Sequence, residues 1–514
     1  MLLQTAPLVP LVTPSGNDLL DLLPELILGG GFIALMLLDL VAGKQRWVLG
    51  ATAILFLAGA FGASVWGWFD SGAGHSLYFG SFAYDKFAMF INMVLLFSTA
   101  LVILISPQYL NRRGIHHGEY YALIIAATLG MMLLAGAMSL MVIFLGIESL
   151  SIALYILSGF ARHEERSQEA ALKYLLLGGF ASGFLLYGMA LVYGETGHTQ
   201  LTLIAQAIAA GGKLSSSVDP LLLAGVILIF VGFAFKASLV PFHAWTPDVY
   251  QGAPTSVTTF MSVTTKVAAF AVIVRVFTYT FPALYTHWQV VVAVVAIASM
   301  VVGNVAALTQ TSLKRMLAYS SIAQAGYILI GVAVGPLTSG SSGNLGTIGV
   351  LYYLAAYAVT QIGAFAVITV MAGRGEDLDS YDGLRGLAYR RPYVAAAMGL
   401  FLLSLGGFPP TAGFFGKFFV FAAAIQANLT VLALWGIATS AVSVFYYLRV
   451  ALLMYQRPRA DQTEYPWSRT TLAGTTVLVA TTAGTLVFGI LVVVLFNGAS
   501  AAQGALLPAL TAAR

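Results

Sequence analysis

Long apolar stretches alternate with short polar loops along almost the whole chain. The stretches are about 20 residues long, which suits an α-helix crossing a bilayer, whereas strands of an outer-membrane barrel are about 10 residues long and alternate in polarity. The pattern therefore predicts an all-α, polytopic membrane bundle. The fourteen predicted spans cover residues 22–42, 47–69, 84–106, 119–137, 139–160, 169–194, 220–246, 254–280, 288–309, 315–336, 346–372, 392–426, 430–455 and 471–496.

Two of these spans contain residues that interrupt a helix. In the seventh span Pro241 follows Lys236, and in the twelfth Pro409 and Pro410 precede Lys417. Proline lacks a backbone N–H and clashes with the preceding turn, so each break frees carbonyl groups that need a polar partner inside the membrane.

The two breaks lie five spans apart, so the broken helices run in opposite directions across the membrane. Matched broken helices of opposite direction are typical of inverted repeats with functional sites at the breaks. We therefore predict two five-helix repeats, formed by spans four to eight and nine to thirteen. The predicted division is a three-helix segment at 1–118, the two repeats at 119–280 and 281–455, and a C-terminal helix and tail at 456–514.

The lysines and arginines of the loops favour one side of the membrane. If the loop after the first span is cytoplasmic, fifteen of the 24 lysines and arginines lie in cytoplasmic loops and three lie on the other side. Cytoplasmic loops carry the excess of positive charge in membrane proteins. The bias predicts that both termini lie outside the cytoplasm, and it supports the span count because one missed helix would invert every later loop.

The composition excludes several kinds of chemistry. Hydrophobic residues make up 59% of the chain and charged residues only 9%, whereas soluble proteins are about a quarter charged. The absence of cysteine excludes disulfides, thiolate zinc sites and cysteine-held iron–sulfur clusters. There is no dinucleotide-binding glycine turn, no histidine pair at metal-ligand spacing, no nucleic-acid signature and no signal peptide at the start. We expect no cofactor or metal in this chain.

Four ionisable residues lie near the middle of predicted spans: Glu148, Lys236, Lys266 and Lys417. A charge at the bilayer centre costs about 2.5 to 3.5 kcal/mol even on a lenient insertion scale, so these residues must be paired, hydrated or neutral for part of the time. Burial favours the neutral amine, and a nearby carboxylate favours the charged one. Three such lysines with a glutamate are therefore predicted to form a proton relay along the core.

Other ionisable residues have simpler interpretations. His243, just after the first break, is either a proton carrier or a satisfied polar group of the loop. Cations near span ends usually extend to the interface, although Lys173 is kept as a possible relay member. The residues expected at the interface are Lys173, Arg275 and Arg449, and those expected to be solvated at span ends are Asp39, Asp70 and Asp85.

Four motifs carry a resemblance to a known family. They are GFAFKASLVPFHAWTPDVYQGAP, TKVAAF, TQTSLKRMLAYSSIAQAGYILIG and GGFPPTAGFFGKFF, and they resemble the antiporter-like membrane subunits of respiratory complex I, the proton-pumping NADH:quinone oxidoreductase. Within this family the chain is most similar to subunit N. The wording PDVYQGAP, a lysine at position 417 where subunit M is expected to have glutamate, and the lack of the long C-terminal helix of subunit L favour that choice.

The resemblance implies roles for the mid-span residues. Glu148 resembles the glutamate paired with the lysine at Lys236, Lys266 matches the connecting lysine, and Lys417 matches the lysine that faces the periplasmic exit. It also implies a bacterial inner-membrane protein, with subunits M and K and lipids as neighbours. NADH, FMN, iron–sulfur clusters and quinone would then belong to partner subunits.

Three alternatives remain open from the sequence. The chain could belong to a sodium/proton antiporter without an oxidoreductase, or to a relative of complex I that uses ferredoxin or hydrogen. A structural spacer that pumps nothing conflicts with three mid-span lysines.

Overall fold

The computed structural model describes residues 16–42, 45–72, 74–210, 219–335, 342–373, 379–458 and 470–506. The prediction that both termini lie outside the cytoplasm concerns residues outside these ranges. Several of the loop cations on which that prediction rests also lie outside them: Lys44, Lys213, Arg374, Arg459, Arg469 and Arg514.

The all-α polytopic architecture is confirmed. Within the described residues, 13 helices are long and apolar enough to cross a membrane. These are α2 (Leu23–Ala42), α3 (Arg46–Asp70), α4 (Lys86–Arg113), α5 (Glu119–Gly136), α6 (Leu140–Ser158), α7 (Glu165–Thr196), α9 (Pro220–Ala237), α11 (Thr255–Val274), α12 (Tyr285–Leu308), α13 (Leu313–Ala333), α14 (Ser342–Met371), α19 (Thr430–Tyr455) and α20 (Leu472–Ile490).

Shorter elements complete the fold. The predicted broken span at 392–426 forms two half-length helices, and the sequence analysis did not predict a short β-hairpin or the helix at Leu201–Ala210. The shorter elements are α1 (Gly16–Asp21), β1 (His75–Leu77), β2 (Phe82–Tyr84), α8 (Leu201–Ala210), α10 (Trp245–Gly252), η2 (Arg275–Thr280), η3 (Pro282–Leu284), α15 (Tyr381–Leu384), α16 (Leu387–Arg390), α17 (Pro392–Gly406), α18 (Ala412–Gln426) and α21 (Val492–Gly504).

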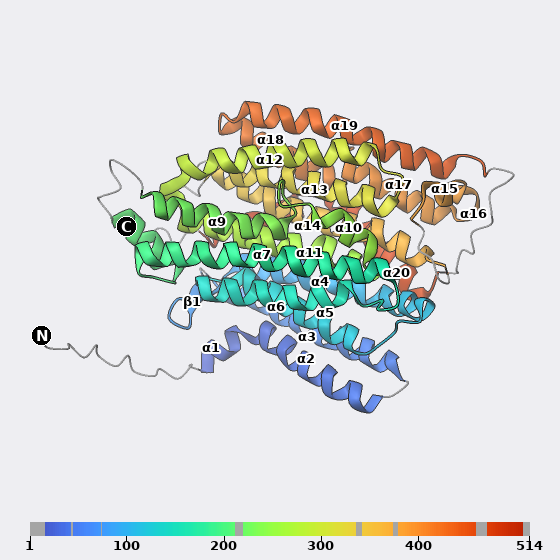
Figure 1. The fold of residues 1–514 in the computed structure, drawn as a ribbon, viewed down its shortest axis with the longest axis horizontal. Coiled ribbons are helices and arrows are strands. Elements are labelled where there is room, and N and C mark those ends of the chain that lie inside the picture. The colour runs from blue at the N-terminus through green and yellow to red at the C-terminus, as the bar shows by residue number, and fades with distance from the viewer. Residues whose placement is uncertain are drawn as a thin grey trace, which may run out of the picture.

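The long helices run roughly side by side, with α2 and α3 at one edge of the bundle and α19 at the other (Figure 1). Helices α11, α13 and α14 lie in the middle, and every residue of α11 is buried. A helix that is apolar on all sides fits such a position, yet these three helices carry many serines, threonines, tyrosines and glutamines. The interior of the bundle is therefore partly polar.

The two predicted breaks are present and have similar backbone geometry. Helix α9 ends at Ser238, whose φ is +63°, and α17 ends at Gly407, whose φ is +86°. A cis X-Pro peptide follows each of these residues, at Pro241 and at Pro410. After the first break the chain forms α10, and after the second it forms α18. Both left-handed caps end a helix inside the bundle rather than at its surface.

The first and last described helices reach the same end of the bundle. Helix α20 starts beside the end of α4, where the Thr471 hydroxyl donates to Gln108 at 2.7 Å. The following helix, α21, reaches the beginning of α4, where Gly498 lies against Phe90. We call the opposite end, where α3 begins at Arg46, the basic end. Helix α21 continues to Gly504, so the last predicted span is longer than the boundary at residue 496.

The structure corrects the prediction for Arg275 and Asp85. Arg275 was expected at the membrane interface and Asp85 was expected to be solvated at a span end, but their side chains are 2% and 8% exposed and form an ion pair with two N–H···O contacts of 2.9 and 3.0 Å. The Arg275 Nε also donates to the Ala135 carbonyl at 3.0 Å, and its guanidinium lies over the Phe87 ring. The pair joins α4, α5 and the π-helical turn that follows α11. A position near a span end does not reveal a buried partner elsewhere in the chain.

We expect Arg275→Leu to destabilise the protein by about 3 to 5 kcal/mol, because it leaves the Asp85 carboxylate buried without its counter-ion. Asp85→Asn keeps an oxygen for the backbone N–H of Ala88 but removes the charge. The double variant should be more stable than the Arg275→Leu single variant. Thermal unfolding of the purified complexes measures this, and additive losses would show that the pair is not a coupled unit.

Candidate functional site

Lys236 lies in the last turn of α9 and is 4% exposed. Its amine donates to the Tyr155 hydroxyl at 3.5 Å and lies 5.2, 5.1 and 5.3 Å from the ring centres of Tyr155, Tyr174 and Phe235. Aromatic faces attract a cation, most strongly where water is excluded. The amine is therefore held by three rings and one hydroxyl rather than by an ion pair.

Glu148 lies on α6 and is half-buried, and its carboxylate accepts a hydrogen bond from Ser182 of α7. Its charge acts on Lys236, but no direct ion pair joins these two described side chains. Tyr155 follows Glu148 by seven residues and so lies on the same face of α6. The Tyr155 hydroxyl thus extends from the glutamate side of the site to the Lys236 amine.

The first break lies directly beyond Lys236. The Phe235 carbonyl accepts from the Trp245 indole N–H and from the Ser238 backbone N–H, both at 3.1 Å, so a side chain adds to the backbone hydrogen bonds that close the last turn of α9. Pro241 is exposed and His243 is half-buried. The buried Nδ1 atom of His243 has no hydrogen-bond partner among the described residues. This histidine is free to bind a further polar group, which keeps the proton-carrier interpretation open.

Lys266 is fully buried in the middle of α11. Its amine donates to the Tyr250 hydroxyl at 3.3 Å and lies 5.6 Å from the centre of the same ring. No carboxylate forms an ion pair with it among the described residues. One hydroxyl and one ring offset only a small part of the free-energy cost of burying an ammonium group. Of the three mid-span amines, this one therefore has the fewest polar partners.

Lys417 lies on α18 and is 4% exposed. Its amine donates to the carbonyls of Leu405 and Gly406 at 3.0 and 3.1 Å and to the Ser440 hydroxyl at 2.8 Å, and it lies 4.7 Å from the Tyr327 ring centre. The two carbonyls belong to the end of α17, where a helix carries partial negative charge. Lys417 is thus itself the polar partner that the second break requires.

Polar side chains of α13 and α14 lie near Lys266. The Ser321 and Tyr357 hydroxyls are 2.7 Å apart, and the Tyr357 hydroxyl donates to the carbonyl of Ser262 at 3.2 Å. Ser262 lies one turn before Lys266 on α11. A hydrogen-bonded group therefore joins α11, α13 and α14 next to the central lysine.

A second group continues to Lys417. The Gln324 amide donates to the Leu405 carbonyl at 2.9 Å and to the Tyr447 hydroxyl at 3.2 Å, and it accepts from Tyr353. The Leu405 carbonyl also accepts from Lys417. Gln324 follows Ser321 by three residues and lies on the same face of α13. This face of α13 thus presents hydrogen-bonding groups from the vicinity of Lys266 to Lys417.

Gln361 lies on the same face of α14 as Tyr357, and its side chain has no hydrogen-bond partner among the described residues. Its side chain is fully buried, yet neither its amide oxygen nor its amide nitrogen makes a hydrogen bond to a described residue. It is one turn after Tyr357 and one turn before Phe365, whose ring contacts Tyr250. Since an unpaired buried amide is costly, this residue suits a place where the interior is hydrated.

An ionic network holds α10 at the basic end of the bundle. Asp248 accepts from Lys173 and from Arg315, both at 2.6 Å, and Gln251 donates to Asp379 at 2.9 Å. Burial of Asp248 favours its neutral form, but the hydrogen bonds from Lys173 and Arg315 outweigh this and lower its pKa. Lys173 is 40% exposed and so lies in this network rather than among the buried lysines.

A polar cavity of about 640 Å³ lies beside this network. It is formed where α10 meets α11, α13 and the segments around Glu164 and Asp379. Both signs of charge line it, so it can hold water. Its lining includes Arg113, Glu164, Arg166, Gln251, Pro254, Ser312, Lys314 and Asp379.

The sequence profile of the family described as "NADH:quinone oxidoreductase/Mrp antiporter, TM" matches residues 137–443, more than half of the 514 residues. The chain belongs to this family. The matched region of this antiporter-like chain, residues 137–443, contains Glu148, the three mid-span lysines and both breaks.

Individual relatives cover nearly the whole antiporter-like chain. It is 44% identical over 471 residues to NADH-quinone oxidoreductase subunit N of Trichlorobacter lovleyi, which is 91% of this chain and 94% of that protein. A chain of Thermus thermophilus respiratory complex I with bound aureothin is 33% identical, with a TM-score of 0.75 over 92% of this chain and 98% of that one. A chain of the Mrp complex of Dietzia is 22% identical with a TM-score of 0.82, covering 95% and 98%, and shows the shared fold alone.

Some residues of this antiporter-like site were not singled out by the sequence analysis, although signals for them exist. The motif YSSIAQAGY contains Ser320, Ser321 and Gln324, which share one face of an otherwise apolar helix. Tyr155 could be found from its spacing to Glu148. Gln361 carries a weaker signal, a single amide within a long apolar span.

We expect Gly407→Ala to perturb the Lys417 site and Gly406→Ala to leave it intact. A β-carbon at Gly407 would lie 3.0 Å from the Lys417 Cδ, on a residue with φ +86°, which disfavours alanine by about 1 to 2 kcal/mol. Gly406 is helical and has its nearest neighbour at 3.4 Å. Thermal unfolding of the two variants should differ in this direction, and equal stabilities would contradict the left-handed cap.

Proposed function

We propose that this chain is the proton-translocating subunit N of a bacterial type I NADH:quinone oxidoreductase. The observation that carries the proposal is that the three mid-span lysines, Lys236, Lys266 and Lys417, are buried with hydrogen-bond partners but no ion-paired carboxylate among the described residues. Such amines can take up and release protons, because neither the charged nor the neutral form is fully stabilised. The similarity to a protein named NADH-quinone oxidoreductase subunit N supports the proposal that this enzyme is the one to which the subunit belongs.

The path begins at the basic end. The polar cavity beside Gln251 and Pro254 provides hydrated access to the interior near α10. A proton then reaches Glu148 and Lys236, which interact through space with the Tyr155 hydroxyl between them. From there it passes to Lys266 and, along the polar face of α13, to Lys417 and the opposite side.

The redox chemistry belongs to other subunits in this proposal. The chain has no cysteine, and the described residues contain no group of three histidines or acids placed to hold a metal. NADH, FMN, iron–sulfur clusters and quinone are assigned to partner subunits, with subunits M and K and lipids as direct neighbours. The basic end faces the cytoplasm of a bacterial inner membrane, and both termini lie on the periplasmic side.

The two repeats predicted at 119–280 and 281–455 belong to the same proposal. Support comes from the similar ends of α9 and α17, where a left-handed cap is followed three residues later by a proline. In the first repeat a lysine precedes the break, and in the second a lysine follows it. The repeats would therefore place their charged groups at different depths along one path.

A sodium/proton antiporter subunit is the main alternative, because the family includes both kinds of protein. The two can be separated by purifying the chain from native membranes in mild detergent and identifying its partners by mass spectrometry. We expect flavin and iron–sulfur subunits to co-purify. Membrane subunits alone would favour the antiporter, and ferredoxin- or hydrogen-oxidising subunits would favour the other relatives.

We expect Lys236→Ala to lower proton pumping strongly while leaving electron transfer from NADH to quinone measurable. The alanine removes the amine that faces Tyr155 and Glu148, whereas the redox groups lie elsewhere. Pumping is followed by the quenching of a pH-sensitive dye in inverted membrane vesicles, with NADH oxidation recorded in the same preparation. Arg162→Gln, an exposed residue at the basic end, serves as the control. Unaltered pumping in Lys236→Ala would overturn the relay.

We expect Gln361→Leu to keep or raise stability and to lower pumping several-fold. Leucine removes a buried amide without partners, which is neutral or favourable for folding. The same change removes the polar group that would hold water between Tyr357 and Phe365. In the proposed path a proton leaves Lys266 through this region. Gln503→Leu is a matched control, because the Gln503 amide nitrogen is also buried without a partner but lies on α21. Equal pumping in both variants would remove Gln361 from the path.

A further inference from the structure

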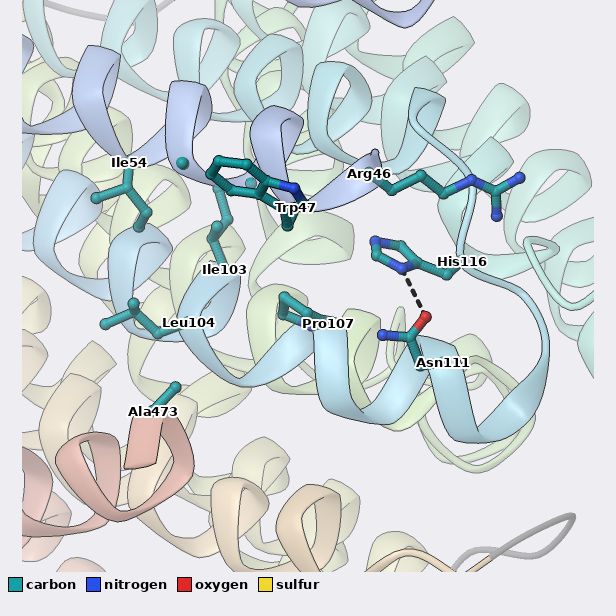
Figure 2. A pocket seen from close by; sticks show the side chains of 11 residues that line it. Arg46, Trp47, Ile54, Ile103, Leu104, Pro107, Asn111, His116 and Ala473 are labelled. Carbon is teal, nitrogen blue, oxygen red and sulfur yellow. Dashed lines mark hydrogen bonds between the residues drawn. The ribbon is translucent and has the colours of Figure 1, made fainter. Parts of the chain in front are cut away.

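A cavity of about 750 Å³ lies at the basic end between α3, α4 and the start of α20. Its two ends differ in character, as Figure 2 shows. Arg46, Asn111 and His116 lie together at one end, while Ile54, Leu104 and Ala473 lie at the other. Trp47 lies between them beside Ile103. The cavity is thus polar towards the end of the bundle and apolar along the helices.

Among the described residues that line the cavity, Arg46 alone carries a charge. The imidazole of His116 uses both nitrogens, at 2.8 Å from Asn111 Oδ1 and 2.9 Å from the Tyr121 hydroxyl. Burial and the nearby Arg46 and His117 lower the pKa of His116 to about 4, so it is neutral at pH 7. Arg46 is half-buried and has no ion-pair partner among the described residues. The polar end therefore presents one uncompensated guanidinium.

The rest of the lining suits an acyl chain. Trp47 is 70% exposed, and aromatic residues of this kind favour the interface between headgroups and hydrocarbon. Gly50 and Ala51 leave space on α3, and Ile54, Ile103 and Leu104 form the apolar wall below. A small soluble anion would leave this wall unused.

We propose that this cavity binds one anionic phospholipid, with its phosphate on Arg46 and one acyl chain along Ile54, Ile103 and Leu104. A guanidinium and a phosphate form a charge-assisted, bidentate contact. A zwitterionic lipid offers the same phosphate but brings a second cation to a site that already has one. Because α3 packs on α4 and Ala473 belongs to α20, the lipid fastens the N-terminal helices to the rest of the bundle.

The test uses the purified complex, depleted of lipid in detergent and then titrated with phosphatidylglycerol. Bound lipid is counted by native mass spectrometry. We expect wild type to retain one phosphatidylglycerol that Arg46→Gln binds about tenfold more weakly. Arg162→Gln is the matched control. Arg162 is an exposed arginine at the same end that does not line this cavity, so the variant should bind the lipid like wild type. Ala51→Phe, which fills the apolar half and leaves the charge, should also lose the lipid.

Three results would overturn the proposal. Retention of the lipid in Arg46→Gln would remove the guanidinium as the headgroup contact. Retention in Ala51→Phe would mean that the anion binds at the surface and that the acyl chain does not enter the cavity. Equal binding of phosphatidylcholine and phosphatidylglycerol by wild type would exclude charge recognition. Ala51 is exposed and Arg46 is half-buried, so neither change removes a residue from the core of the bundle.

Discussion

Burying an amine inside an apolar bundle is the constraint on which the rest of this structure depends. Lys236 is met by three aromatic rings, Lys266 by one tyrosine hydroxyl, and Lys417 by two carbonyls and a serine. None of the three has a carboxylate in contact among the described residues. A bundle held together only by packing would not retain such groups, because each costs several kcal/mol if left charged and dry. Their presence therefore explains why the interior helices are polar.

The helix breaks belong to the same constraint. At the second break the end of α17 supplies the carbonyls that hold Lys417, so the break and the charge satisfy one another. At the first break the Phe235 carbonyl accepts from Trp245 and from the Ser238 backbone N–H, and Lys236 faces the aromatic rings instead. The two breaks thus share a backbone form but differ in what they do for the neighbouring lysine. The Lys417 ammonium is hydrogen-bonded to backbone carbonyls, whereas the Lys236 ammonium faces aromatic rings and one hydroxyl.

Much of this was predictable from the chain, and the failures have physical reasons. Spans and breaks follow from hydropathy and proline, which act locally. Glu148 and the three lysines stand out because a charge in a long apolar run is rare. The predictions of an interfacial Arg275 and a solvated Asp85 were wrong, since the two residues lie 190 positions apart and their pairing depends on how α4 and α11 pack. The hairpin before α4 and the unpaired amide of Gln361 likewise depend on tertiary contacts.

The unequal surroundings of the lysines bear on direction. An ammonium at Lys417 gains three oxygen acceptors and a ring, whereas one at Lys266 gains the hydroxyl and the ring of a single tyrosine. In the proposed relay the Lys417 ammonium thus has more hydrogen-bond acceptors than the Lys266 ammonium, and release of a proton from Lys417 breaks more contacts. Release then requires the carbonyls of Leu405 and Gly406 to find another donor or the end of α17 to shift. A cycle driven from other subunits would act most effectively on that short segment, because it changes the proton's affinity without moving a whole helix.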